Sequence, residues 1–258
     1  MFALKNVTVE LGGTAVLKNI SLEIREGERV VILGINGCGK TTLLKLLNGL
    51  LQPAAGEILY RGEPLAKARL DHPEFKRAFR KDVVLLFQHV DAMLFNPTVR
   101  DEIAFGPRQF GLPEIPAIVD EWARVFELAQ LLERAPFELS GGEKKRVALA
   151  AIMAVGPRVL LLDEPTAHLD PAAAGRLVDF LAGLDGKTIV AATHNLSIIE
   201  ELGDRTIVLG PDHAVAYDGP THDLFHDEAL LVSSGLAHRH IHKHLEAVHA
   251  HYHVHDME

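Results

Sequence analysis

Cysteine is nearly absent from this sequence of 258 residues, in which Cys38 is the single example. An intrachain disulfide is therefore excluded, which suits a reducing compartment such as the cytosol. A broadly basic surface is lacking too, because the formal net charge is −9 with the histidines neutral. Sequence-independent binding of nucleic acid needs many cations against the phosphates, so that class of protein is disfavoured.

Long apolar segments are also missing. The uninterrupted apolar runs are only a few residues long, whereas a membrane-spanning helix needs about 20 apolar residues. The opening MFALKNVTVE lacks the charged-then-apolar order of a signal peptide. We therefore expect a soluble protein, which could still work beside a membrane.

Hydrophobic residues nevertheless make up 48% of the chain, enough for a large core. Apolar runs broken at glycines predict short strands, and the most apolar runs predict strands buried on both faces. Between residues 100 and 154 the apolar spacing becomes helical, with breaks at Gly-Pro and Leu-Pro. The pattern predicts an α/β fold with a mostly parallel core and a helical insertion. The predicted strands cover residues 2–11, 15–24, 29–33, 56–65, 82–88, 158–163, 187–193, 205–210 and 213–219.

The sequence GINGCGKTT, from Gly34 to Thr42, follows one of these buried strands and precedes a helical run. It fits G-x-x-x-x-G-K-[ST], the phosphate-binding loop, in its expected context. Lys40 could reach the β- and γ-phosphates of a nucleotide, and the Thr41 hydroxyl could hold Mg²⁺. An ordinary glycine-rich turn is the alternative. The candidate nucleotide contacts are Asn36, Gly37, Cys38, Gly39, Lys40, Thr41 and Thr42.

Two further segments point to the same chemistry. VLLLDE ends in two acids, of which Asp163 could bind Mg²⁺ through water and Glu164 could act as the general base. Acids of this kind are also common at a plain helix start. LSGGEKKR offers Ser140, Gly141 and Gly142 at a second anion-binding helix N-terminus. Ser140 and Glu143 also fit a capping box, and both interpretations can hold together.

In this order the three motifs resemble the nucleotide-binding domains of ABC transporters, over residues 2–220. The resemblance implies a P-loop NTPase fold with an N-terminal antiparallel β subdomain and a helical, signature-bearing subdomain at about 89–156. It also implies a head-to-tail homodimer, in which Mg²⁺ and ATP lie between the loop of one chain and Ser140–Glu143 of the other. A C-terminal extension would occupy 221–258.

The resemblance assigns further residues. Gln88 would sense Mg²⁺ and the attacking water, Asp170 would end the loop that crosses the dimer, and His194 would be the switch histidine at the γ-phosphate. Many family members stack adenine on an aromatic residue about two dozen positions before the loop, where this sequence has Leu11. Apolar contact from Leu11 or Val16 could cover the base without ring stacking.

A finer resemblance follows Gln88. LLFQHVDAMLFNPTVRDEIAFGP is similar to the corresponding segment of energy-coupling-factor and cobalt/nickel-type importers. That similarity implies that residues 92–99 form an apolar strip for a small membrane scaffold subunit, of T type, at the cytoplasmic face of the membrane. A substrate-binding membrane subunit would complete the importer. Helical core is the alternative role for the strip.

The sequence changes sharply after Gly235, in a His-rich tail from residue 236. Spacings of two and four would align these histidines on an extended chain or a helix, respectively. Imidazoles suit Ni²⁺, Co²⁺, Cu²⁺ and Zn²⁺, so the tail could bind a transition metal; a solvated, unstructured tail or a partly added sequence are the alternatives. One cluster is His238, His240, His242 and His244, and the other is His249, His251, His253 and His255.

Three functions remain open at this point. The first is the ATPase subunit of an importer, for nickel or cobalt or else for a vitamin or another small solute. The second is a soluble ABC-type ATPase acting on DNA or ribosomes, which the absence of sustained heptads between Lys40 and Ser140 disfavours. The third is a metal-storage protein that descends from an ATPase; every catalytic residue type is still present, which disfavours it.

Overall fold

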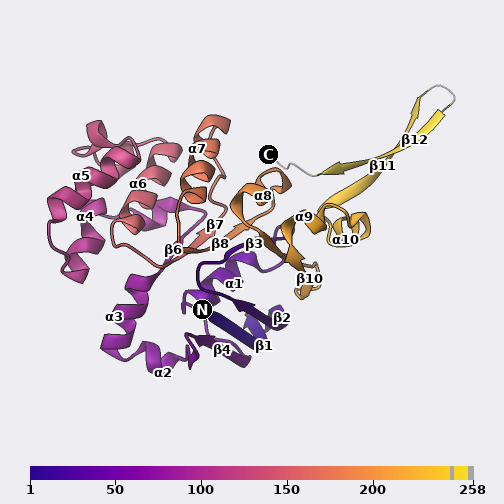
Figure 1. Ribbon diagram of the computed structural model, residues 1–258, viewed down its shortest axis with the longest axis horizontal. Helices are drawn as coiled ribbons and strands as arrows, with labels where there is room; N and C mark the ends of the chain where they lie inside the picture. The colour runs from indigo at the N-terminus through magenta and orange to yellow at the C-terminus, as the bar shows by residue number, and fades with distance from the viewer. Residues whose placement is uncertain (245–246, 255–258) are drawn as a thin grey trace. The chain divides into compact units, whose positions relative to one another are not determined.

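The computed structural model describes residues 1–244 and 247–254. These residues form two compact units, shown in Figure 1. The first unit comprises Met1–Lys67 and Thr188–Glu258, and the second comprises Ala68–Lys187. The chain therefore leaves the first unit once and returns to it.

An antiparallel sheet begins the first unit, with its strands in the order β2-β1-β4-β5. Alternate side chains of β1 are buried over much of its length, and Phe2 pairs with Ile24 on one side and Tyr60 on the other. The strands predicted at 2–11 and 15–24 are confirmed to within one residue. The four strands are β1 (Phe2–Leu11), β2 (Thr14–Ile24), β4 (Ala55–Tyr60) and β5 (Glu63–Pro64).

The first unit also contributes the strand run β10-β9-β3-β8. Strand β3 pairs in parallel with β8 and β9, whereas β10 runs antiparallel to β9. Nearly all residues of β3 and β8 are buried, which explains why their sequences are continuously apolar. The strands are β3 (Arg29–Leu33), β8 (Thr188–Thr193), β9 (Arg205–Leu209) and β10 (Val215–Pro220). The helices of this unit are α1 (Lys40–Leu47), η4 (Leu196–Ile198), α8 (Ile199–Leu202), α9 (Thr221–Leu224) and α10 (Glu228–Ser233).

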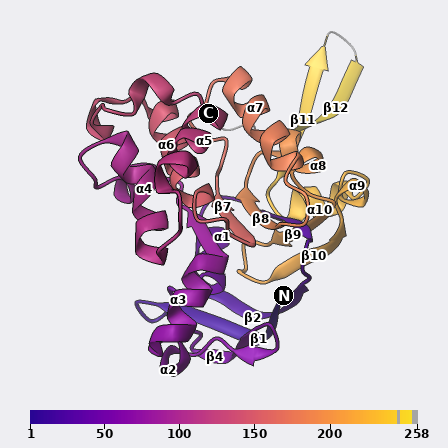
Figure 2. The same ribbon diagram turned by 60° about the vertical axis from the view of Figure 1, so that its left-hand side comes forward.

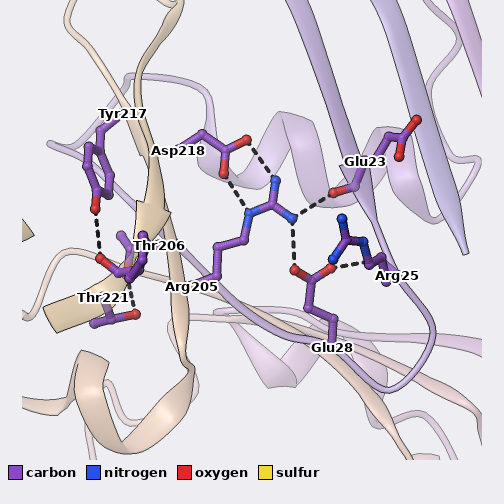
Figure 3. Close-up of polar contacts among 9 residues, drawn as sticks. Glu23, Arg25, Glu28, Arg205, Thr206, Tyr217, Asp218 and Thr221 are labelled. Atoms are coloured by element: carbon purple, nitrogen blue, oxygen red, sulfur yellow. Dashed lines mark hydrogen bonds and ion pairs between the residues drawn. The ribbon is translucent and has the colours of Figure 1, made fainter. Parts of the chain in front are cut away.

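Arg205 links three segments of the first unit (Figure 3). Its guanidinium donates to both carboxylate oxygens of Asp218, at 2.6 and 2.7 Å, and to Glu28 at 2.8 Å. It also donates to the backbone carbonyl of Glu23 at 2.9 Å. The hydrogen bonds to Asp218, with the one to Glu28, raise the pKa of Arg205. A bidentate, partly buried pair of this kind fixes β9 against β10 and against the segment that leads into β3.

The second unit contains two parallel strands, β6 (Val83–Leu86) and β7 (Val159–Asp163). Helices α4, α5 and α6 pack against one another, as Figure 2 shows. The helical elements of this unit are α2 (Lys67–Leu70), α3 (Pro73–Asp82), η1 (Val90–Met93), α4 (Val99–Phe110), α5 (Ile115–Val125), η2 (Ala129–Leu131), η3 (Pro136–Glu138), α6 (Gly141–Met153) and α7 (Pro171–Ala182).

The predicted break at the Gly-Pro sequence is wrong. Helix α4 continues through Gly106 and Pro107 to Phe110, and its C-cap, Gly111, has a left-handed conformation. A Cβ at position 106 would collide with the side chain of Val155, so glycine allows close packing here. The Leu-Pro break after residue 111 is confirmed, because α5 begins at Ile115.

The His-rich segment forms an antiparallel hairpin of two strands, β11 (Ala237–His244) and β12 (Ala247–Val254). The two strands make up a sheet of their own (Figure 1). Of the two backbone conformations that the spacing allowed, the chain adopts the extended one. His255 lies outside the described residues.

Within the described part of the chain, we find no helix with the length and apolarity needed to cross a bilayer.

Candidate nucleotide-binding site

The loop after β3 is shaped by glycines that no other residue could replace without strain. Gly34 has φ 156°, and a Cβ there would lie 2.6 Å from the carbonyl oxygen of Leu209. Gly39 has φ 113°, and its Cβ would lie 2.5 Å from the carbonyl oxygen of Val16. Because these two positions have no side chain, the loop can pack closely on β2 and β9.

Lys40 begins helix α1 and is only 7% exposed. Its ammonium group donates to the carbonyl of Gly34 at 2.6 Å and to that of Ile35 at 3.2 Å, so the positive charge lies against the loop itself. Gly39, at the N-cap, supplies no side-chain cap to the helix. A buried ammonium beside a helix N-terminus of this kind suits a phosphate group.

The remaining loop residues differ in exposure. Asn36 and Gly37 are exposed, and Thr41 and Thr42 are half-buried in the first turn of α1. Cys38 is buried, and burial raises the pKa of its thiol. Cys38 therefore contributes its backbone and its volume rather than a reactive thiolate.

His194 directly follows β8. Thr193, the last residue of β8, is the register partner of Leu33, the last residue of β3. Gly34 and His194 therefore leave neighbouring parallel strands at the same level. Ligands of parallel α/β sheets bind at this carboxyl edge of the strands.

The two residues suggested for adenine lie on the β1–β2 hairpin. Leu11 ends β1 and is 46% exposed, and Val16 is half-buried in β2. The close approach of Gly39 to the Val16 carbonyl places Val16 against the loop. An exposed leucine and a half-buried valine can offer apolar contact to a flat base.

The acidic pair lies at the end of β7 in the second unit. Asp163 is the last residue of β7, and both it and Glu164 are buried. Glu164 has φ 47°, the left-handed region, which is uncommon for a residue other than glycine and recurs at functional sites. The acids therefore stand on a strained turn at the carboxyl edge of a parallel strand.

Gln88 was expected to end its strand, and this is wrong. Strand β6 ends at Leu86, whose register partner in β7 is Leu162. Gln88 lies two residues past β6, half-buried in a bend, as Glu164 lies two residues past Leu162. Gln88 and Glu164 therefore lie equally far past the ends of two adjacent parallel strands.

Lys145 is a residue that we did not predict. It is 3% exposed, and its ammonium donates to the carbonyl of Glu164 at 2.9 Å and to that of Ala167 at 2.7 Å. Burial lowers the pKa of Lys145 to about 8, although the nearby carboxylates of Glu164 and Asp163 oppose the shift. Lys145 thus holds the backbone of the strained turn.

A signal for Lys145 was present in the sequence. At helical spacing it shares a face of α6 with Ala148 and Leu149, which are both buried. A lysine on an apolar helix face needs buried acceptors for its charge.

The start of α6 has the predicted capping box. The Ser140 hydroxyl accepts from the Glu143 N–H at 3.4 Å, and the Glu143 carboxylate accepts from the Ser140 N–H at 2.8 Å and from its hydroxyl at 2.7 Å. These hydrogen bonds lower the pKa of Glu143. Ser140 and Gly141 are exposed, so this helix N-terminus is open to a ligand.

A cavity of ≈ 310 Å³ in the second unit joins the signature residues to Asp170. The residues that line it include Ser140, Gly142 and Glu143, at the start of α6, and Asp170, which precedes α7. The Asp170 carboxylate accepts from the Ala173 N–H at 2.9 Å and caps α7. The structure thus brings Asp170 to the signature helix, with a capping role of its own.

The candidate residues therefore fall into two groups, each within one unit. The phosphate loop, Val16 and His194 belong to the first unit, and Gln88, the acidic pair, the signature and Asp170 belong to the second. The histidines from 238 to 253 lie on the hairpin of the first unit.

A lysine-bearing phosphate loop between a buried strand and a helix, with two acids at the end of another parallel strand, defines a P-loop nucleoside triphosphatase. The chain belongs to the ABC transporter family, whose family model matches residues 17–167. It is an ATPase of that family.

Two relatives illustrate the similarity. The energy-coupling factor transporter ATP-binding protein EcfA1 of Methanospirillum hungatei is 41% identical over 86% of this chain and 79% of its own length. The nickel import ATP-binding protein LarO of Lactiplantibacillus plantarum is 38% identical over 87% of this chain and 95% of its own length.

Solved structures agree with the fold. The cbiO1 subunit of the ABC transporter complex cbiONQ from Clostridium perfringens matches with a TM-score of 0.76 and 32% identity, covering 91% of this chain and 94% of that one. The ATP-binding cassette MJ0796, in a dimeric post-hydrolysis state bound to ADP and Pi, matches with a TM-score of 0.76 and 31% identity, covering 86% and 99%.

Proposed function

We propose that this chain is the ATP-hydrolysing subunit of an energy-coupling-factor-type importer that carries nickel or cobalt ions. One observation carries the ATPase part of the proposal: a single chain holds both a loop with a buried lysine and a second, open helix N-terminus at Ser140. Each can bind a phosphate, so two copies could supply complementary halves of two sites.

The residues of one site would divide the work as follows. Lys40 and the loop backbone bind the β- and γ-phosphates, and His194 contacts the γ-phosphate from the neighbouring strand end. Mg²⁺, held by Thr41, Gln88 and Asp163, would neutralise the phosphate oxygens. Glu164 accepts the proton of the attacking water, and Lys145 keeps its backbone in place.

The second half of the site would come from another copy of the chain. The open terminus of α6 presents Ser140, Gly141 and Gly142 to the γ-phosphate of that copy, with Asp170 beside them. The dimeric state of the similar cassette bound to ADP and Pi supports this arrangement. The whole set is present in one chain, so a homodimer would hold two competent sites.

The apolar strip at residues 92–99 is evidence in favour of a membrane subunit as partner. Phe95 is 65% exposed, and its ring packs edge-on against that of Phe105, with centroids 4.9 Å apart. The buried carboxylate of Glu102 accepts hydrogen bonds from the N–H groups of Phe95 and Asn96 and from the Asn96 side chain. A carboxylate so placed would hold an exposed aromatic pair ready for an apolar partner helix.

Membership of a transporter complex is supported by the names of the two relatives. Within such a complex this chain would lie at the cytoplasmic face of the membrane. Nickel is favoured over a vitamin or another small solute by the nickel-import relative and by the histidines of β11 and β12. Imidazole is a ligand that suits Ni²⁺ and Co²⁺.

The test combines hydrolysis with co-purification. Glu164→Gln should lower the rate of ATP hydrolysis by about 10²–10⁴-fold, as expected for loss of a general base, while ATP still binds. Detergent extraction of the tagged chain should bring down small hydrophobic membrane subunits, identified by mass spectrometry, and cells with the complex should take up radioactive nickel or cobalt.

The strip has a matched control. Phe95→Asp should release the membrane subunits, whereas Phe137→Asp should keep them, because Phe137 is even more exposed, at 81%, but lies outside the strip. Recovery of ribosomes or nucleic acid in place of membrane subunits would refute the importer.

A further inference from the structure

The turn between β9 and β10 lies against the phosphate loop, within the first unit. Residues 210–214 form this turn, and the His213 N–H donates to the Gly210 carbonyl at 3.0 Å. The loop begins close to the start of the turn, because a Cβ at Gly34 would be 2.6 Å from the carbonyl oxygen of Leu209. A side chain of the turn can therefore reach the loop.

His213 makes this contact. Its Nδ1 atom lies 3.3 Å from the carbonyl oxygen of Cys38, at the long end of the range for a hydrogen bond. A carbonyl oxygen can only accept, so the Nδ1 atom carries a proton and donates it. The carbonyl of His213 in turn accepts from the N–H of Lys18, in β2, at 2.9 Å. His213 thus joins β2, the phosphate loop and its own turn, which are distant in the sequence.

The backbone of His213 has a conformation that suits other residues better. Its φ is 69°, in the left-handed region, which glycine adopts without strain and which asparagine and aspartate adopt more readily than most. A half-buried histidine in this conformation costs free energy that glycine would not. The hydrogen bond from its ring to the loop is an interaction that glycine could not make.

The Cys38 carbonyl belongs to the same peptide unit as the N–H of Gly39. This peptide bond is trans, so its C=O and N–H bonds point in opposite directions. Holding the carbonyl toward His213 therefore directs the Gly39 N–H away from the turn. Gly39 is the N-cap of α1, directly before Lys40, where a phosphate would lie. A donor at the carbonyl also polarises the peptide, which makes its N–H a stronger donor.

We propose that His213 is a positioning residue of the nucleotide site. Through the Cys38 carbonyl it fixes the orientation of the peptide between Cys38 and Gly39, and so raises the affinity of the loop for the phosphates of ATP. His213 contacts the loop and not the nucleotide. This role rests on the proposed binding of the β- and γ-phosphates by the loop, but it is independent of the imported solute and of the membrane subunits.

Three substitutions at position 213 separate the hydrogen bond from the backbone conformation. Glycine, asparagine and aspartate all suit a positive φ, so the turn should tolerate each of them. The amide nitrogen of asparagine is two bonds from Cβ, as Nδ1 of histidine is, so His213→Asn keeps a donor in place. His213→Asp puts an oxygen there that only accepts, and His213→Gly removes the side chain.

The affinity of the full-length chain for ATP with Mg²⁺ is measured by displacement of a fluorescent ATP analogue. His213→Gly should weaken binding by about two- to twelvefold, the usual effect of one hydrogen bond. His213→Asp should weaken it further, because its charge repels the phosphates. His213→Asn should stay within about twofold of the unchanged chain. Unchanged affinity in His213→Gly, or a loss in His213→Asn as large as in His213→Gly, would overturn the proposal.

Steady-state hydrolysis and thermal unfolding separate positioning from damage to the fold. The peptide would bind the phosphates of substrate and transition state alike, so His213→Gly should raise KM and leave kcat within about twofold. Without nucleotide, the three variants should unfold at similar temperatures, since each suits the left-handed backbone. Losses of affinity that follow the unfolding temperatures of the variants would assign the effect to the fold and overturn the proposal.

Asn19→Gly is the matched control. Asn19 is exposed, has φ 51° and follows Lys18 in β2, so this change also puts glycine at a left-handed position near the contact. ATP affinity should not change; a loss equal to that of His213→Gly would overturn the proposal. If Lys40→Met weakens ATP binding and His213→Gly does not, the role of His213 is refuted and the loop keeps its assignment. If neither weakens it, the phosphate-binding role of the loop fails as well.

Discussion

The N-termini of helices α1 and α6 can both bind an anion, but the two are built differently. At α1 the N-cap is Gly39, which has no side chain to accept from the helix, and the Lys40 ammonium lies against the loop carbonyls. At α6 the Ser140 hydroxyl accepts from the Glu143 N–H, and the Glu143 carboxylate accepts from the Ser140 N–H. The N-terminus of α1 thus has a positive charge and no side-chain cap, whereas that of α6 is capped and has the carboxylate of Glu143 beside it.

This difference in charge and capping suggests that the two helix termini bind phosphate with different strength and in a fixed order. A phosphate at α1 gains a nearby ammonium and a helix N-terminus that has no side-chain cap, so it should bind there strongly and first. A phosphate at α6 must approach a carboxylate that is ionised at neutral pH, since hydrogen bonds from Ser140 lower its pKa. Binding at α6 should therefore be weak until a nucleotide is already held by another copy.

Breaking the α1 terminus should have the largest effect. Lys40→Met removes the ammonium while keeping much of the buried stem, and we expect ATP hydrolysis to fall by about 10²–10³-fold, as for loss of one preorganised donor to a transferring group. Rates at saturating ATP and binding of a fluorescent nucleotide would measure it. Lys45→Met, which removes a lysine from the last turn of the same helix, should change neither; an active Lys40→Met protein would contradict the assigned loop.

The anchor of α6 should have the next largest effect. Lys145→Met leaves the carbonyls of Glu164 and Ala167 without this donor, at a cost of about 1–3 kcal/mol in the free energy of unfolding. Hydrolysis should fall as well, because the backbone of Glu164, at φ 47°, loses its support. Urea unfolding and ATPase rates give the two readouts, with Lys144→Met, whose partner Asp91 is exposed, as the control.

The pH dependence of the free energy of unfolding can show whether Lys145 acts through its buried charge or only through the packing of its side chain. The pKa of Lys145 is about 8 in the folded chain and 10.5 ordinarily. Below pH 8 Lys145 is protonated in both the folded and the unfolded chain. Between pH 8 and 10.5 it is protonated mainly in the unfolded chain, which therefore binds more protons than the folded chain. Stability of the unchanged chain should therefore rise relative to Lys145→Met from pH 8 to 10.5, by about 3 kcal/mol. A constant difference across this window would show that the ammonium is not desolvated.

The phosphate loop and the buried lysine show how far the sequence can be interpreted. Gly34, Gly39 and Lys40 were predictable, because a loop that must turn with positive φ around an anion leaves few choices of residue. Strands β3, β7 and β8 were predictable for a similar reason, since continuous apolar runs mark strands buried on both faces.

Contacts between distant segments were not predictable in this way. The acceptors of Lys145 lie 19 and 22 residues along the chain. The packing of Gly106 on Val155 spans a still larger separation in the sequence. The register of β11 and β12 is likewise left open by the alternation of histidines along the sequence. Local spacing predicts elements and motifs, while the partners that position them come from tertiary packing.

The smallest predicted effect tests the α6 terminus itself. Glu143→Gln keeps an oxygen that can accept from the Ser140 N–H, so the capping box and the stability of α6 should survive. It removes the negative charge that a second copy's phosphate would meet, and in the hydrolysis-deficient Glu164→Gln background the ATP-bound dimer should tighten by about three- to tenfold, roughly 1 kcal/mol. Sedimentation at several salt concentrations would measure this, since screening should shrink the gain. A weaker dimer in the glutamine variant would mean that the carboxylate of Glu143 is itself needed at the interface, and the contrast between the two helix termini would no longer explain the order of binding.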